Sequence, residues 1–361
     1  MHPIFGPLSY PMYRPEAEDL YELLYQVYPD PPDINNKYNR CGPGLPPLNV
    51  GQSPDKIWTE ALNHLAARAL LQVFCTKVRG EQIAPQLKEV LDRVFNAEPS
   101  VDKNFFSEYV MVLNRLTLRS YLRMLETDAS PMKVLMIRGG FKSGKSHCSY
   151  LFDHVAKDNG GKSVYIGDGM VGTLNEVIDL LFIALEKQTP VQQGLTTGDA
   201  WYRTVCLSLL LKVKEAKSVL WIAVDDLGNG EDGAPRLDPE IRKFFDQFVL
   251  QMANPDFRKW FRLMLIHYPE GPVPSKWRSE HWEEIITQAT DIQQRDIEEA
   301  IRKWCKMKAL NTPEDEISKK AESILATSDA PPPPGQPAVP RLRRINDEVN
   351  KALRNLSIPG V

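Results

Sequence analysis

The chain has 361 residues, 42% of them apolar and 25% charged, the composition of a globular protein with room for two or three cores. Its net charge of -3 argues against a general nucleic-acid binder, and its five well-separated cysteines, with no CxxC pair, argue against a disulfide framework or a zinc site. The longest apolar runs are too short to span a bilayer, so we expect a cytoplasmic protein without membrane contact.

The N-terminal quarter predicts a small all-α domain at 15–98, after an irregular arm at 1–14. The run "RPEAEDLYELLYQVYP" has apolar residues at helical spacing and a proline suited to a first turn. A short helix is expected at Asp33–Asn39, and a further one in "APQLKEVLDRVF". Between them, apolar pairs recur every four residues from Ser53 to Val78, which predicts one long helix.

From about residue 104 the pattern becomes an alternation of helices with short, uniformly apolar runs, as expected for buried parallel strands. The expected strands are 133–139, 162–168, 218–226 and 261–269. The expected helices between them are Ser143–Ala156, Leu174–Gln188, Ala200–Ala216 and Pro239–Ala253. Two more helices complete a predicted α/β domain at 104–326. A proline-rich linker at 327–340 and a basic helical tail at 341–361 follow.

The segment "GGFKSGKS" matches the GxxxxGK(S/T) pattern of a phosphate-binding loop and lies between a predicted strand and a predicted helix. Its glycines let successive N–H groups curl around phosphate anions at the start of the helix. Lys145 is expected to reach the β- and γ-phosphates of ATP or GTP, and Ser146 to ligate Mg²⁺. The residues expected to contact the nucleotide are Gly139, Gly140, Phe141, Lys142, Ser143, Gly144, Lys145, Ser146 and His147.

The run "SVLWIAVDDLG" is an apolar strand that ends in two acids, the Walker B pattern. Asp225 is expected to hold Mg²⁺, and Asp226 to polarise the attacking water. Lys145, at the β- and γ-phosphates, is the other residue expected to act in hydrolysis. Some eighty residues separate the two motifs, which suits P-loop NTPases with an extra strand between the motif strands. Since Asp has a shorter reach than the Glu usual in AAA-type ATPases, hydrolysis is expected to be slow.

Past the next strand, His267 is the candidate sensor of the third phosphate; a strand-capping histidine is the other interpretation. An arginine finger is not identified by the sequence. The arginines considered are Arg236, Arg242, Arg258 and Arg262.

These motifs and the residues around them resemble those of a known protein family. The run "LNRLTLRSYLRMLETDASPMKVLMIRGGFKSGKS" resembles the entry to the NTPase module of STAND proteins, especially the compact bacterial group tied to immunity and conflict systems. A motif like Asn114-Arg115 precedes the phosphate loop there, the Walker B strand ends like Val224-Asp225-Asp226, and "RLMLIHYP" is similar to the next strand. The segment "EEIITQATDIQQRDIEEAIRKW" resembles the closing strand and helix. This resemblance covers about 105–310 and implies an ASCE-type P-loop NTPase, with a mostly parallel sheet sandwiched by helices.

The N-terminal domain is similar to the effector-associated, death-domain-like adaptor domains of the same systems. The segments that carry the similarity are "DLYELLYQVYP", "RCGPGLPPLNVG" and "IWTEALNHLAARALLQVF". The resemblance implies that residues 15–98 bind a protein effector or a like adaptor domain.

Four interpretations follow. The first is a switch that couples the nucleotide state to an effector in antiphage defence, with homo-oligomer formation a possible part of the mechanism. The second is a small-molecule kinase, which is disfavoured because no arginine-rich lid sequence follows the predicted helix after the phosphate loop. The third is a DNA-associated AAA-type ATPase of the helicase-loader kind, which the acidic balance disfavours and the basic tail favours. The fourth is a scaffold that binds nucleotide without hydrolysis. The sequence favours the switch, with slow hydrolysis at most.

Overall fold

The computed structural model describes residues 3–5, 10–12, 15–81, 83–96, 100–104, 112–113, 115–127, 130–140, 142–167, 169–186, 198–228, 235–331 and 339–356. The chain divides into two units. The first, here the helical unit, comprises Met1–Asp102 with Lys157–Gly160, and the second, the sheet unit, comprises Lys103–Ala156 with Gly161–Val361.

Short helices build the helical unit. They are α1 (Pro15–Val27), α2 (Pro31–Asn39), α3 (Pro54–Ala67), α4 (Leu71–Arg79) and α5 (Pro85–Asn96), with the 3₁₀ turns η1 (Pro3–Phe5) and η2 (Ser100–Asp102). Four of the five α-helices begin at a proline, whose fixed φ and missing N–H suit a first turn. The core contains Trp58 and Phe74, both buried, with their rings edge to face at 5.8 Å.

The prediction of a single helix from Ser53 to Val78 is wrong, because the helix is interrupted by a turn between α3 and α4. Ala69 adopts a left-handed backbone with φ of 55°, and the N–H of Leu70 closes the turn on the carbonyl of Leu65 at 2.8 Å. Neither glycine nor proline marks this turn, and the apolar pattern continues through it, so the sequence carries no signal for the break.

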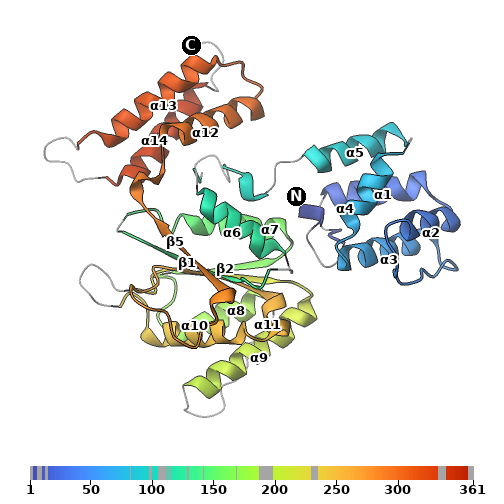
Figure 1. Cartoon of the computed structure of the whole chain (residues 1–361), viewed down its shortest axis with the longest axis horizontal. Coiled ribbons are helices and arrows are strands. Elements are labelled where there is room, and N and C mark those ends of the chain that lie inside the picture. Colours follow the sequence, from blue (N-terminus) through green and yellow to red (C-terminus); the bar gives the residue numbers. More distant parts are fainter. Residues whose placement is uncertain are drawn as a thin grey trace. The chain divides into compact units, whose positions relative to one another are not determined.

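A parallel sheet forms the centre of the sheet unit (Figure 1). Its strands are β1 (Val134–Gly139), β2 (Lys162–Ile166), β3 (Leu220–Val224), β4 (Phe261–Ile266) and β5 (Trp282–Thr287), in the order β2-β3-β4-β1-β5. The four expected strands are confirmed, and β4 does lie between the two motif strands. Since all strands are parallel, their carboxyl ends meet at one edge, where the segments that follow β1, β3 and β4 come together.

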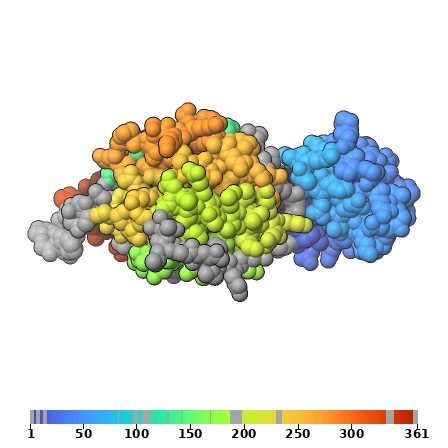
Figure 2. Space-filling view, turned by 90° about the horizontal axis from the view of Figure 1, so that it is seen from below, coloured from blue at the N-terminus to red at the C-terminus, as the bar shows by residue number. Residues whose placement is uncertain are grey.

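Helices cover both faces of this sheet. They are α6 (Leu116–Glu126), α7 (Cys148–Asp158), α8 (Leu174–Ala184), α9 (Asp199–Ala216), α10 (Pro239–Gln251) and α11 (Pro255–Trp260). Figure 1 shows α6 and α7 on one face and α8 to α11 on the other. In Figure 2, α9 and α10 (yellow-green to gold) cover the second face. There Phe244, Phe245 and Phe248 of α10 share one core with alternate residues of β1, β3 and β4. On the first face, Phe152 of α7 packs edge to face on Trp221 at 5.0 Å.

Three C-terminal helices form a further core, α12 (Gln294–Met307), α13 (Glu314–Asp329) and α14 (Arg341–Leu356), which follow the 3₁₀ turns η3 (Ser279–His281) and η4 (Ala289–Asp291). We predicted α14 as a basic tail. In the structure Ile345, Val349 and Leu353 lie on one side of it, at four-residue spacing, and are buried with α12 and α13. No helix among the described residues is long and apolar enough to cross a bilayer.

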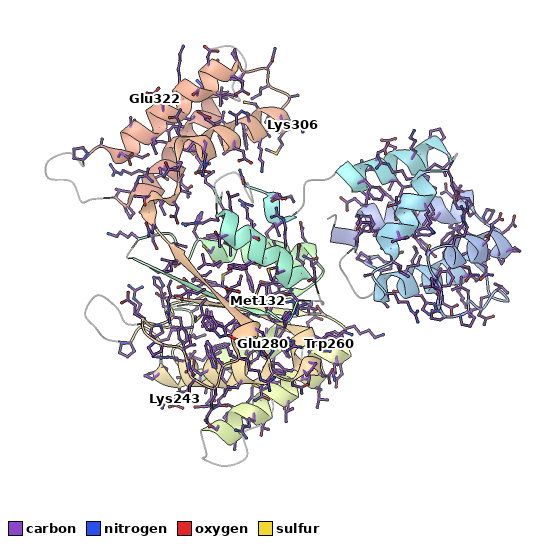
Figure 3. All side chains as sticks on the ribbon, in the orientation of Figure 1. Met132, Lys243, Trp260, Glu280, Lys306 and Glu322 are labelled. Atoms are coloured by element: carbon purple, nitrogen blue, oxygen red, sulfur yellow. The ribbon has the colours of Figure 1, made fainter. Side chains whose placement is uncertain are left out.

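The two ends of the strands differ in character. Met132 lies just before β1 and Trp260 just before β4, so these two residues, labelled in Figure 3, mark the amino edge of the sheet. The chemistry-bearing motifs lie at the opposite, carboxyl edge.

Candidate functional site

The loop after β1 has two positions that only glycine fits. At Gly139, φ is 139° and an added Cβ would lie 2.1 Å from the carbonyl oxygen of Thr287 on β5. At Gly144, φ is 79° and a Cβ would lie 2.8 Å from both a guanidinium nitrogen of Arg115 and Cδ1 of Leu342. The loop therefore passes between β5, α6 and α14 without room for a side chain at these two points.

Further contacts fix the loop to its surroundings. The Ser143 hydroxyl lies 2.8 Å from the Thr287 hydroxyl, and Arg115 donates to the carbonyl oxygen of Ser143 at 2.8 Å. Arg115, with φ of 65°, also pairs with Asp291 of η4 at 2.9 Å. Asn114 lies outside the described residues, but its neighbour Arg115 thus ties the loop to the segment before α12.

Lys145 is the loop's buried cation, with 4% of its surface exposed. Its ammonium donates to the carbonyl oxygens of Gly139 at 2.8 Å and of Gly140 at 2.6 Å, so it lies within the loop. Burial lowers the pKa of Lys145, and the nearby carboxylates of Asp225 and Asp226 oppose that shift.

The helix after the loop begins later than expected. We predicted its start at Ser143, whereas α7 begins at Cys148. The left-handed backbone of Gly144 excludes a start at Ser143, and the N–H of Cys148 then bonds to the carbonyl of Lys145, three residues earlier, at 2.9 Å, as in a 3₁₀ turn.

Asp225 is the buried acid of the site, with 1% of its surface exposed. Tyr165 of β2 donates its hydroxyl to one carboxylate oxygen at 3.0 Å, and His267 Nδ1 lies 2.8 Å from the other. The backbone N–H of Asp226 bonds to that second oxygen at 2.7 Å. Burial alone would raise the pKa of Asp225, but hydrogen bonds from His267 and Ser146 outweigh it and hold the pKa below its ordinary value.

Asp226 and His267 both have left-handed backbones, with φ of 59° and 55°. The Asp226 carboxylate accepts from Arg236 at 2.7 Å and lies 3.4 Å from His267 Nδ1. The acid expected to polarise water is therefore held in an ion pair in this conformation.

A cavity of about 490 Å³ opens beside the loop. One wall is the loop from Lys142 to His147, with Arg236 and His267. The apolar part of the lining comes from Val112, Leu113, Ile292, Pro340, Leu342 and Ile345. Arg115 and the polar residues Arg343, Asn346, Asp347 and Asn350 of α14 complete the lining. A lining that combines a phosphate-binding loop with apolar side chains suits the two parts of a nucleotide.

Some of the residues expected at the site line the cavity and others lie elsewhere. The residues from Lys142 to His147 line the cavity, His147 lies 3.5 Å from Asn346, and Phe141 lies outside the described residues. Among the arginines considered, Arg236 reaches the site. The other three lie elsewhere: Arg242 over the Tyr268 ring, Arg258 against His281 and Arg262 among backbone carbonyls.

Sequence reasoning missed Tyr165, Thr287 and the residues of α14. The periodic Ile345, Val349 and Leu353 could have indicated that α14 packs, but nothing in their spacing indicates what they pack against. Mg²⁺ suits the donor set at the loop, because the Ser146 hydroxyl and the Asp225 carboxylate are oxygen ligands already in hydrogen-bond contact.

Comparison with known proteins gives structural similarity alone. No protein-family model and no curated protein matches the sequence. Among solved structures, Cdc6p from Pyrobaculum aerophilum is 16% identical with a TM-score of 0.39, over 63% of this chain and 58% of that chain. The ORC2 protein of Aeropyrum pernix in its ADP form is 14% identical with a TM-score of 0.40, over 71% of each chain. A chain of the HORMA:CdnC:Trip13 complex of E. coli MS115-1 is 13% identical with a TM-score of 0.31, over 66% of this chain and 78% of that chain.

The fold is defined by this chain's own geometry. A parallel sheet of order β2-β3-β4-β1-β5, a glycine-dependent loop after β1 and a buried acid after β3 make it an α/β P-loop NTPase fold, preceded by a helical unit.

Proposed function

We propose that this chain is an ATP·Mg²⁺-binding switch, in which nucleotide occupancy controls the position of the α12–α14 helices and, through it, an effector partner. The observation that carries the proposal is the composition of the cavity. One wall is the phosphate loop and the other is α14, so a ligand that fills the cavity contacts both. Such a ligand shifts a conformational equilibrium through the contacts it makes in one state and lacks in the other.

The roles of the site residues follow from their positions. In the proposed complex Lys145 leaves the carbonyl oxygens of Gly139 and Gly140 to reach the phosphates, and N–H groups of the loop hold the phosphate oxygens. Ser146 and Asp225 hold Mg²⁺, which neutralises charge on the phosphates. The apolar wall around Leu342 and Ile345 takes the base, for which we propose adenine over guanine.

Hydrolysis is slow in this proposal. Asp226 is the acid that would orient water, and its carboxylate is bound by Arg236 at 2.7 Å. A charge-assisted hydrogen bond of this kind lowers the basicity of the Asp226 carboxylate toward a water molecule. The chain is then a switch first and an ATP hydrolase second.

The partner side of the proposal rests on sequence resemblance. Residues 15–98, which belong to the helical unit, bind a protein effector or a like adaptor domain, in the manner of compact STAND NTPases of bacterial antiphage defence. Homo-oligomer formation belongs to the same proposal.

A DNA-associated ATPase is the second candidate, and the arginines at the start of α14 are the feature that favours it. Two of them make internal contacts: Arg341 pairs with Asp329 and with backbone carbonyls, and Arg344 binds the carbonyl of Ala330. This use of the charges weakens the second candidate. Salt-dependent binding to duplex DNA at low ionic strength would restore it.

The test is the affinity of the full chain for a fluorescent ATP analogue, measured together with partner activation. Lys145→Ala is expected to abolish both. Normal partner activation by a Lys145→Ala chain that no longer binds the analogue refutes nucleotide control. Tight binding without phosphate release in the wild type leaves a scaffold or switch that does not hydrolyse ATP.

A further inference from the structure

Three side chains with metal-ligating atoms converge at the carboxyl edge of the sheet. One ligand atom each from Asp225, Asp226 and His267 lies within 4.8 Å of the other two. His267 Nδ1 is 2.8 Å from an oxygen of Asp225 and 3.4 Å from an oxygen of Asp226. These distances bracket the separation of about 3.0 Å expected between adjacent ligands of a six-coordinate ion with bonds of about 2.1 Å.

Two of these three residues have an unusual backbone conformation. Asp226 and His267 are both non-glycine residues with positive φ, a conformation that residues with a side chain adopt uncommonly. The two strained residues follow neighbouring strands, β3 and β4, and they direct their side chains to the same point. A histidine that only caps a strand does not need a strained carboxylate beside it.

The donor set differs from the one that Mg²⁺ prefers. Mg²⁺ takes oxygen ligands and binds nitrogen poorly, whereas imidazole suits first-row transition metals. We propose that Asp225, Asp226 and His267 form a direct binding site for a divalent transition-metal ion of the Mn²⁺ type, which the chain holds without nucleotide and in preference to Mg²⁺. The inference deepens the proposed function, on which it rests for its biological use, because Asp225 is also the acid expected to serve the nucleotide's cation.

The site has polar support around it. Tyr165 donates to the Asp225 oxygen that does not face His267, and Arg236 binds Asp226, so both carboxylates are oriented before the ion arrives. Asp225 is almost fully buried, which shields the ion from water on one side. Asp225 and Asp226 both raise the pKa of Lys145, against the larger lowering by burial, so the two carboxylates act on this ammonium as well.

The experiment is a titration of the full chain with Mn²⁺ in the absence of nucleotide, followed by electron paramagnetic resonance. We expect one tightly bound Mn²⁺ per chain and a pulsed spectrum with the nitrogen coupling of a coordinated imidazole. His267→Asn removes the imidazole and is expected to lower the Mn²⁺ affinity by at least about tenfold while changing the Mg²⁺ affinity little. His64→Asn, in α3 of the helical unit, is the matched control and is expected to behave as wild type.

Bound Mn²⁺ without nitrogen coupling, or unchanged Mn²⁺ affinity in His267→Asn, overturns the inference. If His267→Asn does not fold, the coupling measured on the wild type decides the question by itself. Binding of the ATP analogue in the presence of Mg²⁺ and the absence of Mn²⁺ is measured in parallel. Nitrogen coupling without ATP binding supports the metal site and refutes the nucleotide switch, whereas ATP binding without nitrogen coupling does the reverse.

Discussion

Gly139→Ala tests whether the loop geometry is as tight as the structure indicates. The added Cβ would lie 2.1 Å from the Thr287 carbonyl oxygen and 2.9 Å from the hydroxyls of Ser143 and Thr287. The first contact is more than 1 Å shorter than a normal carbon–oxygen contact and involves backbone at the end of β5. The alanine must also adopt φ of 139°. Backbone strain and overpacking together predict a loss of about 3 kcal/mol in the free energy of unfolding of the sheet unit.

The assay is thermal unfolding of the full chain, with binding of the ATP analogue as a second measurement. A loss of about 3 kcal/mol corresponds to a fall of roughly 6–12 °C in the Tm of the sheet unit. Gly140→Ala is the matched control, because a Cβ there meets nothing within 4 Å and the backbone is not left-handed. Equal Tm values for the two variants would show that the close approach of β1 and β5 is not a real constraint.

Further predictions concern the charges, the thiols and α14. Arg236→Ala frees Asp226 and is expected to raise the rate of phosphate release about three- to tenfold, whereas Asp226→Asn abolishes release; a lower rate in Arg236→Ala would instead make Arg236 part of the catalytic machinery. Burial alone would raise the pKa of Asp225, but hydrogen bonds from His267 and Ser146 hold it below the ordinary value of about 3.9. Ionised Asp225 therefore stabilises the fold above about pH 4, and this contribution is lost as the pH falls through the lower folded pKa. In urea unfolding, the stability difference between wild type and Asp225→Asn should shrink from about pH 5 to about pH 3, and a constant difference contradicts the assignment. All five cysteines are buried, and burial raises the pKa of Cys148 to about 11, so a thiol reagent should label none within minutes in the native chain and five in denaturant. Deletion of 341–361 removes one wall of the cavity and should weaken binding of the ATP analogue at least about tenfold; unchanged affinity would show that α14 does not contact the nucleotide.

The sheet could be predicted from the sequence because its strands are short, apolar and separated by clear helices. Each expected strand contains the observed one, and the interval between the motifs correctly indicated a strand between β1 and β3. The phosphate loop was equally clear, since it depends on glycine and lysine at fixed spacing. These features depend on residues that are close together in the sequence, so short sequence patterns are enough to predict them.

The rest depended on contacts between distant segments. The pairing of Arg236 with Asp226 joins residues across a segment partly outside the described residues, and no spacing rule predicts it. The break at Ala69 uses a left-handed alanine, which composition does not reveal. Most importantly, α14 resembles a basic tail when its sequence is taken alone, because only three of its residues are fully buried and the core they join is built with α12 and α13.

The central claim is that nucleotide binding reaches α14. Hydrogen exchange of the amides of α14 (Arg341–Leu356), measured by mass spectrometry with and without ATP·Mg²⁺, tests it most directly. We predict that ATP·Mg²⁺ slows exchange both in the phosphate loop and in the first turns of α14 in the wild type, and in neither segment of Lys145→Ala. Slowed exchange in the loop with unchanged exchange in α14 would contradict the switch, because the nucleotide would then bind without contacting the helices that it is proposed to control.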